Sequence, residues 1–200
     1  MTIKKYLSLD NSLESFQLIK LESEIFWKSI ELENCWGLQI QAGSKWNKGL
    51  SEEQLKDFQN QMNLEFPESL KNFYRTMNGL NKPAVNNNGG EGTLEYGSLF
   101  YSYPEDIKII KSQIEWVLEA NKISQGDLKT YNIPPIFPYF GHRFLLFDHP
   151  ENVLSMYGDD IIFWADILSK GIAKDIFSLY SIKENKNSKI KSFWNDRLDK

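Results

Sequence analysis

The chain has 200 residues, of which 41% are hydrophobic and 25% are charged, a composition typical of one globular domain with a full core. Its net charge of −4 argues against a general nucleic-acid binder, which needs Lys and Arg to hold phosphates. The single cysteine, Cys35, excludes an internal disulfide and fits a reducing compartment. No stretch approaches the ~20 apolar residues of a membrane helix, and no signal-peptide core follows the N-terminal lysines, so we predict a cytoplasmic protein without membrane contact.

The N-terminal region has a helical pattern. Between residues 11 and 34, apolar residues recur at roughly helical spacing, and Lys and Glu occupy positions between them. Residues 36–41 then alternate apolar and polar side chains, which predicts a short strand. We therefore predict a helical segment over residues 1–35 that precedes the main domain.

The stretch from Trp46 to Leu80 carries the clearest local signals. Ser51 is followed three positions later by Gln54, which is a capping box: each side chain accepts a hydrogen bond from the other residue's backbone amide. A helix should begin here and end near Asn63. Its buried stripe consists of residues three or four positions apart, namely Leu55, Phe58 and Met62.

A second helix should follow at once. Pro67 suits its first position, because the missing amide proton would have no partner there. Leu70 begins an apolar stripe that runs to Met77. Asn78-Gly79 predicts the end of the helix, with Gly79 in the left-handed conformation of a C-terminal cap.

The middle of the chain mixes loop, strand and helix signals. The composition of residues 83–92 predicts a loop, and residues 93–103 are aromatic and β-prone, which predicts one or two strands. Pro104 should open a helix that ends near Asn121. Residues 133–138 contain three prolines, which lack backbone donors, so we predict an extended lead-in and not a central strand.

Strand signals dominate the region that follows. The predicted strands cover residues 142–147, 153–157 and 161–164, and the last two form a hairpin around a turn at Gly158-Asp159. Helical spacing returns over residues 165–177. A last helix should hold Ile190, Phe193, Trp194 and Leu198.

Three patterns in the sequence could form a chemical site. Residues 157–160 read Tyr-Gly-Asp-Asp, which carries metal-binding carboxylates in viral RNA polymerases, but this chain is far too short for a polymerase and lacks the basic charge. His142 and His149 are the only histidines, and their spacing of seven fits no recognised ligand pattern. Cys35 has no visible catalytic partner. We therefore predict a polar turn, surface histidines and a small buried thiol, with no catalytic residue, no metal and no cofactor.

Carboxylates crowd a short region in which Arg143 is the only fixed cation; they are Asp148, Glu151, Asp159, Asp160 and Asp166. One interpretation is a solvated acidic edge. The other is a surface that meets a basic protein, because complementary charge raises the association rate and the selectivity. A nuclease is a natural basic partner, since its own active site is built to hold phosphate.

The order and spacing of these segments resemble the SUKH superfamily. Its usual pattern is a Trp and a Gly before a helix, a Leu/Phe-Pro that opens a second helix, and an Asn-Gly close. The residues that carry the pattern here are Trp46, Gly49, Ser51, Pro67, Leu70, Asn78 and Gly79. Residues 100–106 and 141–160 fit its later part, so the resemblance covers residues 36 to 177.

The resemblance implies an α+β fold, with a mostly antiparallel sheet flanked by helices. We expect one SUKH-like domain over residues 36–180, preceded by the helical segment of residues 1–35. Residues 181–200 should form a C-terminal helix that packs on this core.

The superfamily includes yeast regulators of cell-wall glucan synthesis and many bacterial immunity proteins. The resemblance therefore implies a non-enzymatic protein-binding module, and we predict an immunity protein that neutralises a basic, nuclease-type toxin. The predicted binding residues lie on an acidic surface and are Asp148, Glu151, Asp159 and Asp160. Two alternatives stay open: a regulatory or scaffold protein like the yeast members, and an enzyme whose site the sequence does not reveal.

Overall fold

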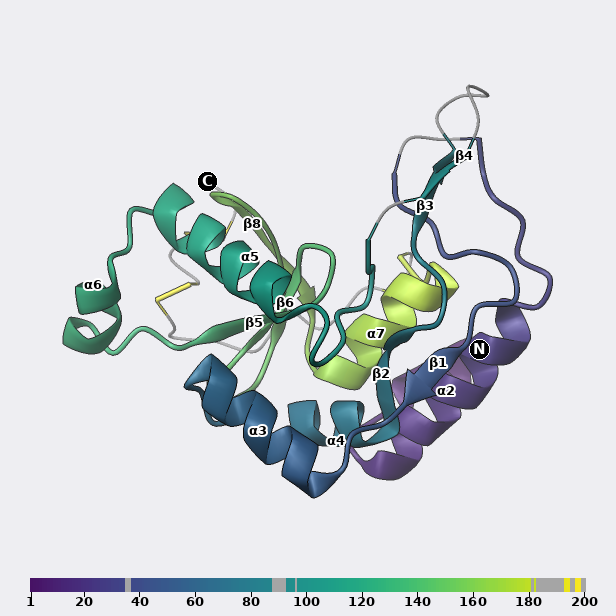
Figure 1. Cartoon of the computed structure of the whole chain (residues 1–200), viewed down its shortest axis with the longest axis horizontal. Coiled ribbons are helices and arrows are strands. Elements are labelled where there is room, and N and C mark those ends of the chain that lie inside the picture. The colour runs from purple at the N-terminus through teal and green to yellow at the C-terminus, as the bar shows by residue number, and fades with distance from the viewer. Residues whose placement is uncertain are drawn as a thin grey trace.

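The computed structural model describes residues 1–34, 37–87, 93–95, 97–180, 182, 193–194 and 197–198. It has the predicted α+β fold, with antiparallel sheets flanked by helices (Figure 1). The elements in chain order are α1 (Ile3–Leu7), α2 (Leu13–Phe26), β1 (Trp46–Lys48), α3 (Glu52–Met62), α4 (Glu68–Thr76), β2 (Met77–Leu80), β3 (Val85–Asn87), β4 (Thr93–Glu95), α5 (Ile107–Ala120), α6 (Gln125–Thr130), β5 (Ile136–Phe140), β6 (Arg143–Leu146), β7 (Val153–Tyr157), β8 (Asp160–Ala165) and α7 (Leu168–Phe177). No helix in these residues is both long enough and apolar enough to cross a membrane.

The largest sheet has the strand order β5-β6-β7-β8, and each neighbouring pair is antiparallel. Successive side chains of a strand point to opposite faces, and both faces of this sheet are buried. Leu145 and Val153 join the cluster that also holds residues of α2, α4 and α7. Phe144, Leu154 and Met156 join a second cluster, which holds residues of α5. The sheet is therefore the middle layer of the domain.

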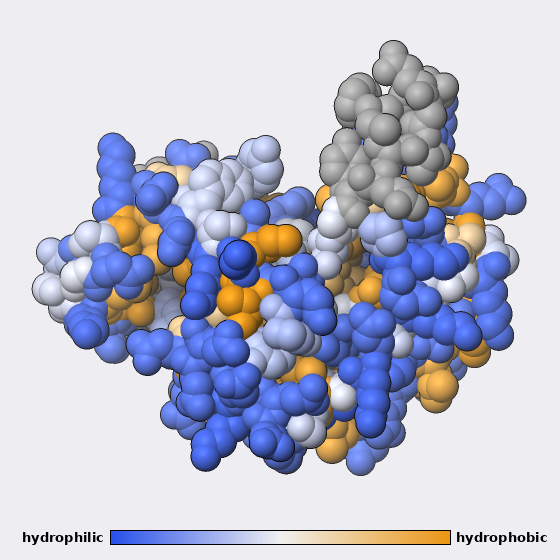
Figure 2. All heavy atoms as spheres, in the orientation of Figure 1, coloured by the Kyte–Doolittle hydropathy of each residue, from blue (hydrophilic) through white to orange (hydrophobic). Residues whose placement is uncertain are grey.

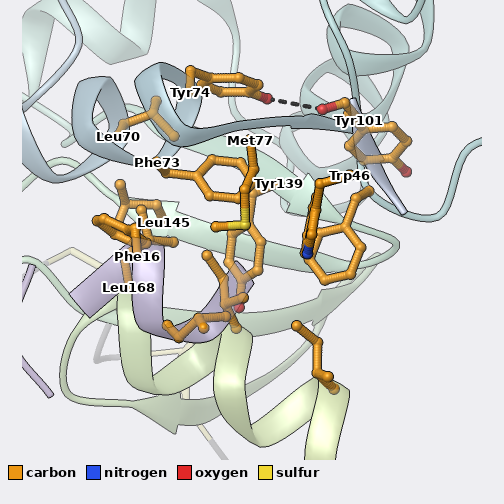
Figure 3. Packing of buried hydrophobic residues seen from close by; sticks show 14 of the residues in the cluster. Phe16, Trp46, Leu70, Phe73, Tyr74, Met77, Tyr101, Tyr139, Leu145 and Leu168 are labelled. Atoms are coloured by element: carbon orange, nitrogen blue, oxygen red, sulfur yellow. Dashed lines mark hydrogen bonds between the residues drawn. The ribbon is translucent and has the colours of Figure 1, made fainter. Parts of the chain in front are cut away.

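The larger cluster contains the buried side chains of the stretch from Trp46 to Leu80. Figure 3 shows Trp46, Phe73 and Tyr139 packed within it. The Tyr74 hydroxyl donates a hydrogen bond to the Tyr101 carbonyl oxygen at 3.2 Å. This buried bond connects α4 to the segment that leads into α5.

The predicted helical hairpin is present as α3 and α4. The Gln54 amide donates to Ser51 Oγ at 3.2 Å, and the Ser51 amide donates to Gln54 Oε1 at 2.9 Å, which confirms the capping box. α3 ends before Asn63, which adopts the left-handed conformation at φ 51°. Pro67 precedes the first residue of α4 by one position.

The predicted role of Gly79 is wrong. α4 ends at Thr76, and Asn78-Gly79 lies in β2, which pairs with β1. Gly79 has the predicted left-handed conformation, at φ +70°, and its position also lacks space, because a Cβ there would lie 2.7 Å from the Cβ of Ser102. The helix therefore ends two residues before Asn78-Gly79, and these two residues serve the packing of β2 against residues 100–102.

Residues 133–138 do not form a central strand, as predicted, but they are more than a lead-in, because their second half belongs to the edge strand β5. β5 begins at Ile136, and Pro138 pairs with Phe144. β5 is the edge of the four-stranded sheet, where a missing backbone donor is tolerated. The register shifts between Pro138 and Phe140, which is where the proline interrupts the ladder.

Other boundaries also differ from the predictions. The helix expected up to residue 34 ends at Phe26. Of the strand expected over residues 36–41, the described part is residues 37–41, and there only Gln39 pairs, in an isolated bridge with Val85. α6 was not predicted, although Ser124 and Asp127 form its capping box. Cys35, Trp36 and most of the predicted C-terminal helix lie outside the described residues. Trp194 is described, and it is buried with its Nε1 donating to the Pro134 carbonyl oxygen at 3.0 Å.

Candidate functional site

The hairpin of β7 and β8 presents the Tyr-Gly-Asp-Asp tetrapeptide at its turn. Tyr157 pairs with Asp160, and Gly158 and Asp159 connect them. Gly158 has φ +64°, a conformation that glycine adopts without strain and that tight hairpin turns require. The side chains of Tyr157 (67% exposed), Asp159 and Asp160 are therefore held in solvent at the end of the sheet.

The C-terminal half of α5 supports this turn. Asn121, which caps α5, donates from Nδ2 to the Gly158 carbonyl oxygen at 3.1 Å. The Trp116 ring meets the Tyr157 ring edge to face, with centroids 5.1 Å apart and an interplanar angle of 84°. Trp116 remains 38% exposed. Two aromatic side chains from separate elements thus form one exposed contact area beside two carboxylates.

His142 borders the same area. Its ring lies edge to face with Tyr157, at a centroid distance of 6.0 Å. Desolvation and the neighbouring charge of Arg143 lower the pKa of His142 to about 4, and Asp160 opposes part of this shift. The imidazole is therefore neutral at pH 7 and does not compensate the carboxylates. We call this group the turn surface; it consists of Trp116, His142, Tyr157, Asp159 and Asp160.

The structure divides the four predicted acidic residues between two places. Asp159 and Asp160 lie at one end of β7, whereas Asp148 and Glu151 lie at the other end, in the connection from β6. A strand of five residues such as β7 spans about 15 Å. One contact with a small partner side chain can therefore engage only one of the two pairs.

The second pair is engaged within the protein. An oxygen of Asp148 accepts a hydrogen bond from the His149 amide at 2.8 Å. Glu151 accepts a hydrogen bond from the hydroxyl of Ser69, near the start of α4. Neither Asp159 nor Asp160 has such a hydrogen bond or an ion pair with another residue in the described part of the chain.

Arg143 does not neutralise the surface carboxylates, because its side chain is used inside the domain. Its Nε donates to Asp175 Oδ1 at 3.1 Å, its Nη1 donates to Ser155 Oγ at 2.5 Å, and its guanidinium lies 3.6 Å from the centre of the Trp164 ring. This ion pair joins β6 to α7. A groove of about 640 Å³ reaches it; residues 26–33 and 38–40 line one side of the groove, and the end of α7 lines the other.

Asp175 is a buried ionisable residue that no pattern in the sequence singles out. Its side chain is 1% exposed, and burial raises its pKa to about 6, while the charge and hydrogen bond of Arg143 oppose the rise. The Tyr139 hydroxyl donates to Asp175 Oδ2 at 3.3 Å. The partner of Asp175, Arg143, is 32 residues away, so no local signal connects the two.

The residues that carry the family pattern build the frame and do not form a ligand site. Trp46 is buried and donates from Nε1 to Ser23 Oγ at 2.8 Å. Asn78 exchanges two hydrogen bonds of 2.8 Å with the backbone of Tyr103. Leu70 is fully buried. Within the described residues, no three His, Cys, Asp or Glu side chains are grouped so that they could hold a metal ion.

Comparison with known proteins identifies one similarity. The sequence model of the SMI1 / KNR4 family (SUKH-1) matches residues 49–180. This span includes the α3–α4 hairpin, the four-stranded sheet and the whole turn surface. No curated protein and no solved structure matches the chain.

Proposed function

Because the chain belongs to the SMI1 / KNR4 family (SUKH-1), we propose that it is a cytoplasmic, non-catalytic protein-binding module, and specifically an immunity protein that neutralises a basic toxin. The toxin would dock on the turn surface. The observation that carries the proposal is the exposure of Tyr157 and Trp116 beside the unpaired carboxylates of Asp159 and Asp160.

The composition of the turn surface suits a protein partner. Tyr and Trp are enriched among the few residues that dominate binding energy at protein interfaces. Tyr157 is already held by its contacts with Trp116 and His142, so less side-chain freedom is lost when a partner binds. An aromatic face beside a carboxylate also suits an Arg or Lys side chain, which the ring and the charge both attract.

The charge of the surface favours a nuclease-type toxin. A nuclease holds phosphate with basic side chains, and these remain available when no substrate is bound. Asp159 and Asp160 would meet such side chains, and the opposite charges would accelerate association. Covering the phosphate-binding residues would block the toxin without any chemical step.

Between the two acidic pairs, Asp159 and Asp160 fit the role better. Glu151 would have to give up its hydrogen bond with Ser69 to meet a partner. Asp148 is half-buried, whereas Asp159 and Asp160 are exposed. We therefore assign the main contact to the turn surface and a secondary contact, for a large partner, to Asp148 and Glu151.

The test is isothermal titration calorimetry of the purified chain with a basic toxin domain encoded by a neighbouring gene, and the association rate is measured separately by stopped-flow mixing. Asp159→Lys/Asp160→Lys should weaken binding about 100-fold, which is ~2.7 kcal/mol, and most of the loss at low salt should appear in the association rate. The matched control is Glu65→Lys/Glu105→Lys, which makes the same charge change at exposed positions elsewhere. Wild-type affinity in the turn variant would contradict the proposed surface.

A regulatory or scaffold role, as in the yeast members, is the alternative within the same family. It requires a different partner, not a different fold. Under this alternative the neighbouring toxin domain does not bind, and the tagged chain recovers cell-wall or signalling proteins from its native lysate. Stoichiometric capture of the toxin domain supports the immunity role instead.

A further inference from the structure

The outer face of α2 carries two long aliphatic side chains that the described part of the chain does not cover. α2 buries Phe16 and Ile19 in the core, where it packs on α4 and α7. Leu21 and Ile25 lie on the opposite side of the helix and are 65% and 62% exposed, more than any other aliphatic side chain among the described residues. A surface helix normally places polar residues there.

The surface view is consistent with these exposed fractions. Figure 2 shows hydrophobic side chains at the outer edge of α2, surrounded by hydrophilic neighbours. Single exposed apolar residues are common on protein surfaces. Two long aliphatic residues one turn apart on one helix face are a contact surface of the kind that another helix covers.

Leu21 and Ile25 belong to an ordered stripe along this face. Its members follow at intervals of three, four, four and three positions, which keeps them on one side of the helix; they are Glu14, Gln17, Leu21, Ile25 and Lys28. Lys28 lies in the turn after α2, and its amide still donates to the Ile25 carbonyl oxygen at 3.3 Å. We call these five residues the α2 stripe.

The charges of the α2 stripe are arranged symmetrically about Leu21. Glu14 lies seven positions before Leu21, and Lys28 lies seven positions after it. Both charged side chains are exposed, and neither makes an ion pair or side-chain hydrogen bond with another residue in the part of the chain that the structure describes. The stripe is therefore complementary to its own reversed copy.

We propose that the α2 stripe is the interface of a homodimer, in which α2 packs antiparallel on α2 of a second copy about a twofold axis at Leu21. This arrangement places Leu21 against its own symmetry mate and Gln17 against Ile25. It also places Glu14 against Lys28, and the twofold axis makes this pair twice. A parallel arrangement would bring Glu14 against Glu14 and Lys28 against Lys28, which repel.

The size of the contact sets the expected affinity. The α2 stripe covers 14 steps along the chain from Glu14 to Lys28, or about 21 Å of helix. A contact of one helix with another falls at the small end of specific interfaces. The dimer should therefore dissociate with a Kd of about 10–100 µM.

The first experiment is sedimentation velocity of the full chain from about 1 to about 500 µM, a range that brackets this Kd. The mass should rise from 23.4 kDa toward twice that value. Leu21→Glu should remain monomeric, because it puts two like charges on the axis. The control is Ile109→Glu, an exposed aliphatic residue on α5 (39% exposed), which should dimerise like the wild type.

A charge exchange tests the antiparallel geometry. Glu14→Lys alone and Lys28→Glu alone should each weaken the dimer about tenfold, because each creates two repulsive pairs. The double variant Glu14→Lys/Lys28→Glu should restore the wild-type Kd to within about threefold, because the attraction is rebuilt with the signs reversed. The proposal is overturned if the wild type stays at 23.4 kDa throughout, if Leu21→Glu dimerises normally, or if the double variant is no tighter than the single ones.

Discussion

Replacing Gly49 by alanine should destabilise the protein strongly, because the backbone of α4 occupies the space that the methyl group would need. A Cβ at this position would lie 1.9 Å from the Arg75 carbonyl oxygen and 2.9 Å from the Thr76 nitrogen. Both atoms belong to the backbone, so no side-chain rotation can relieve the clash. The Leu50 amide donates to the Tyr74 carbonyl oxygen at 2.8 Å, and this bond would lengthen as the two segments moved apart.

The expected loss combines two effects. Overpacking of this kind costs ~1–3 kcal/mol, and a weakened backbone hydrogen bond adds ~0.5–1.5 kcal/mol, so the free energy of unfolding should fall by about 1.5–4.5 kcal/mol. Urea unfolding should show a lower midpoint with an unchanged m value. Gly97→Ala is the control, because a Cβ there meets no atom within 4 Å, and it should stay within about 0.5 kcal/mol of the wild type. A wild-type midpoint for Gly49→Ala would refute the close approach.

Acid should affect stability through two groups in opposite directions. Burial raises the pKa of Asp175 from 3.8 to about 6, so the folded chain holds this proton more tightly than the unfolded chain does. The protonated carboxyl therefore stabilises the fold fully below pH 3.8, and this stabilisation is lost as the pH rises to about 6. Asp175→Asn should remove this decrease in the free energy of unfolding, which is on the order of 3 kcal/mol, when urea unfolding is measured between pH 4 and 7. If the variant kept the pH dependence of the wild type, the burial of this carboxylate would be contradicted. The pKa of His142 is lowered from 6.5 to about 4, so its contribution is full above pH 6.5 and lost as the pH falls to about 4. His142→Gln should remove that loss, and NMR should follow one imidazole that titrates near pH 4, whereas a midpoint near 6.5 would contradict its desolvation.

Local signals predicted the parts of the fold that local chemistry determines. The capping box of Ser51 and Gln54 needs only the two residues, and it is present. The hairpin around Gly158 follows from alternation and a turn glycine, and it is present too. The left-handed conformation of Gly79 was predicted correctly, but its role as a helix cap was not, because this glycine packs against Ser102, which is 23 positions away.

The candidate site was predictable only in part, for the same reason. The exposure of Asp159 and Asp160 follows from their place in a turn. The contribution of Trp116 does not, because it depends on where the end of α5 meets the hairpin. One signal was available in the sequence: Trp116 lies off the buried stripe of its helix, on the side that faces solvent.

The two proposed surfaces belong to separate parts of the molecule. Figure 1 shows α5 and β8 on one side and α2 on the other, so a dimer through α2 leaves the turn surface of each copy free. Binding and dimerisation should then vary independently. Leu21→Glu should abolish the dimer and leave the affinity for the toxin domain unchanged, whereas Asp159→Lys/Asp160→Lys should weaken that affinity and leave the dimer intact. A variant that changes both measurements would mean that the partner reaches α2, and that the toxin and the second copy compete for one surface.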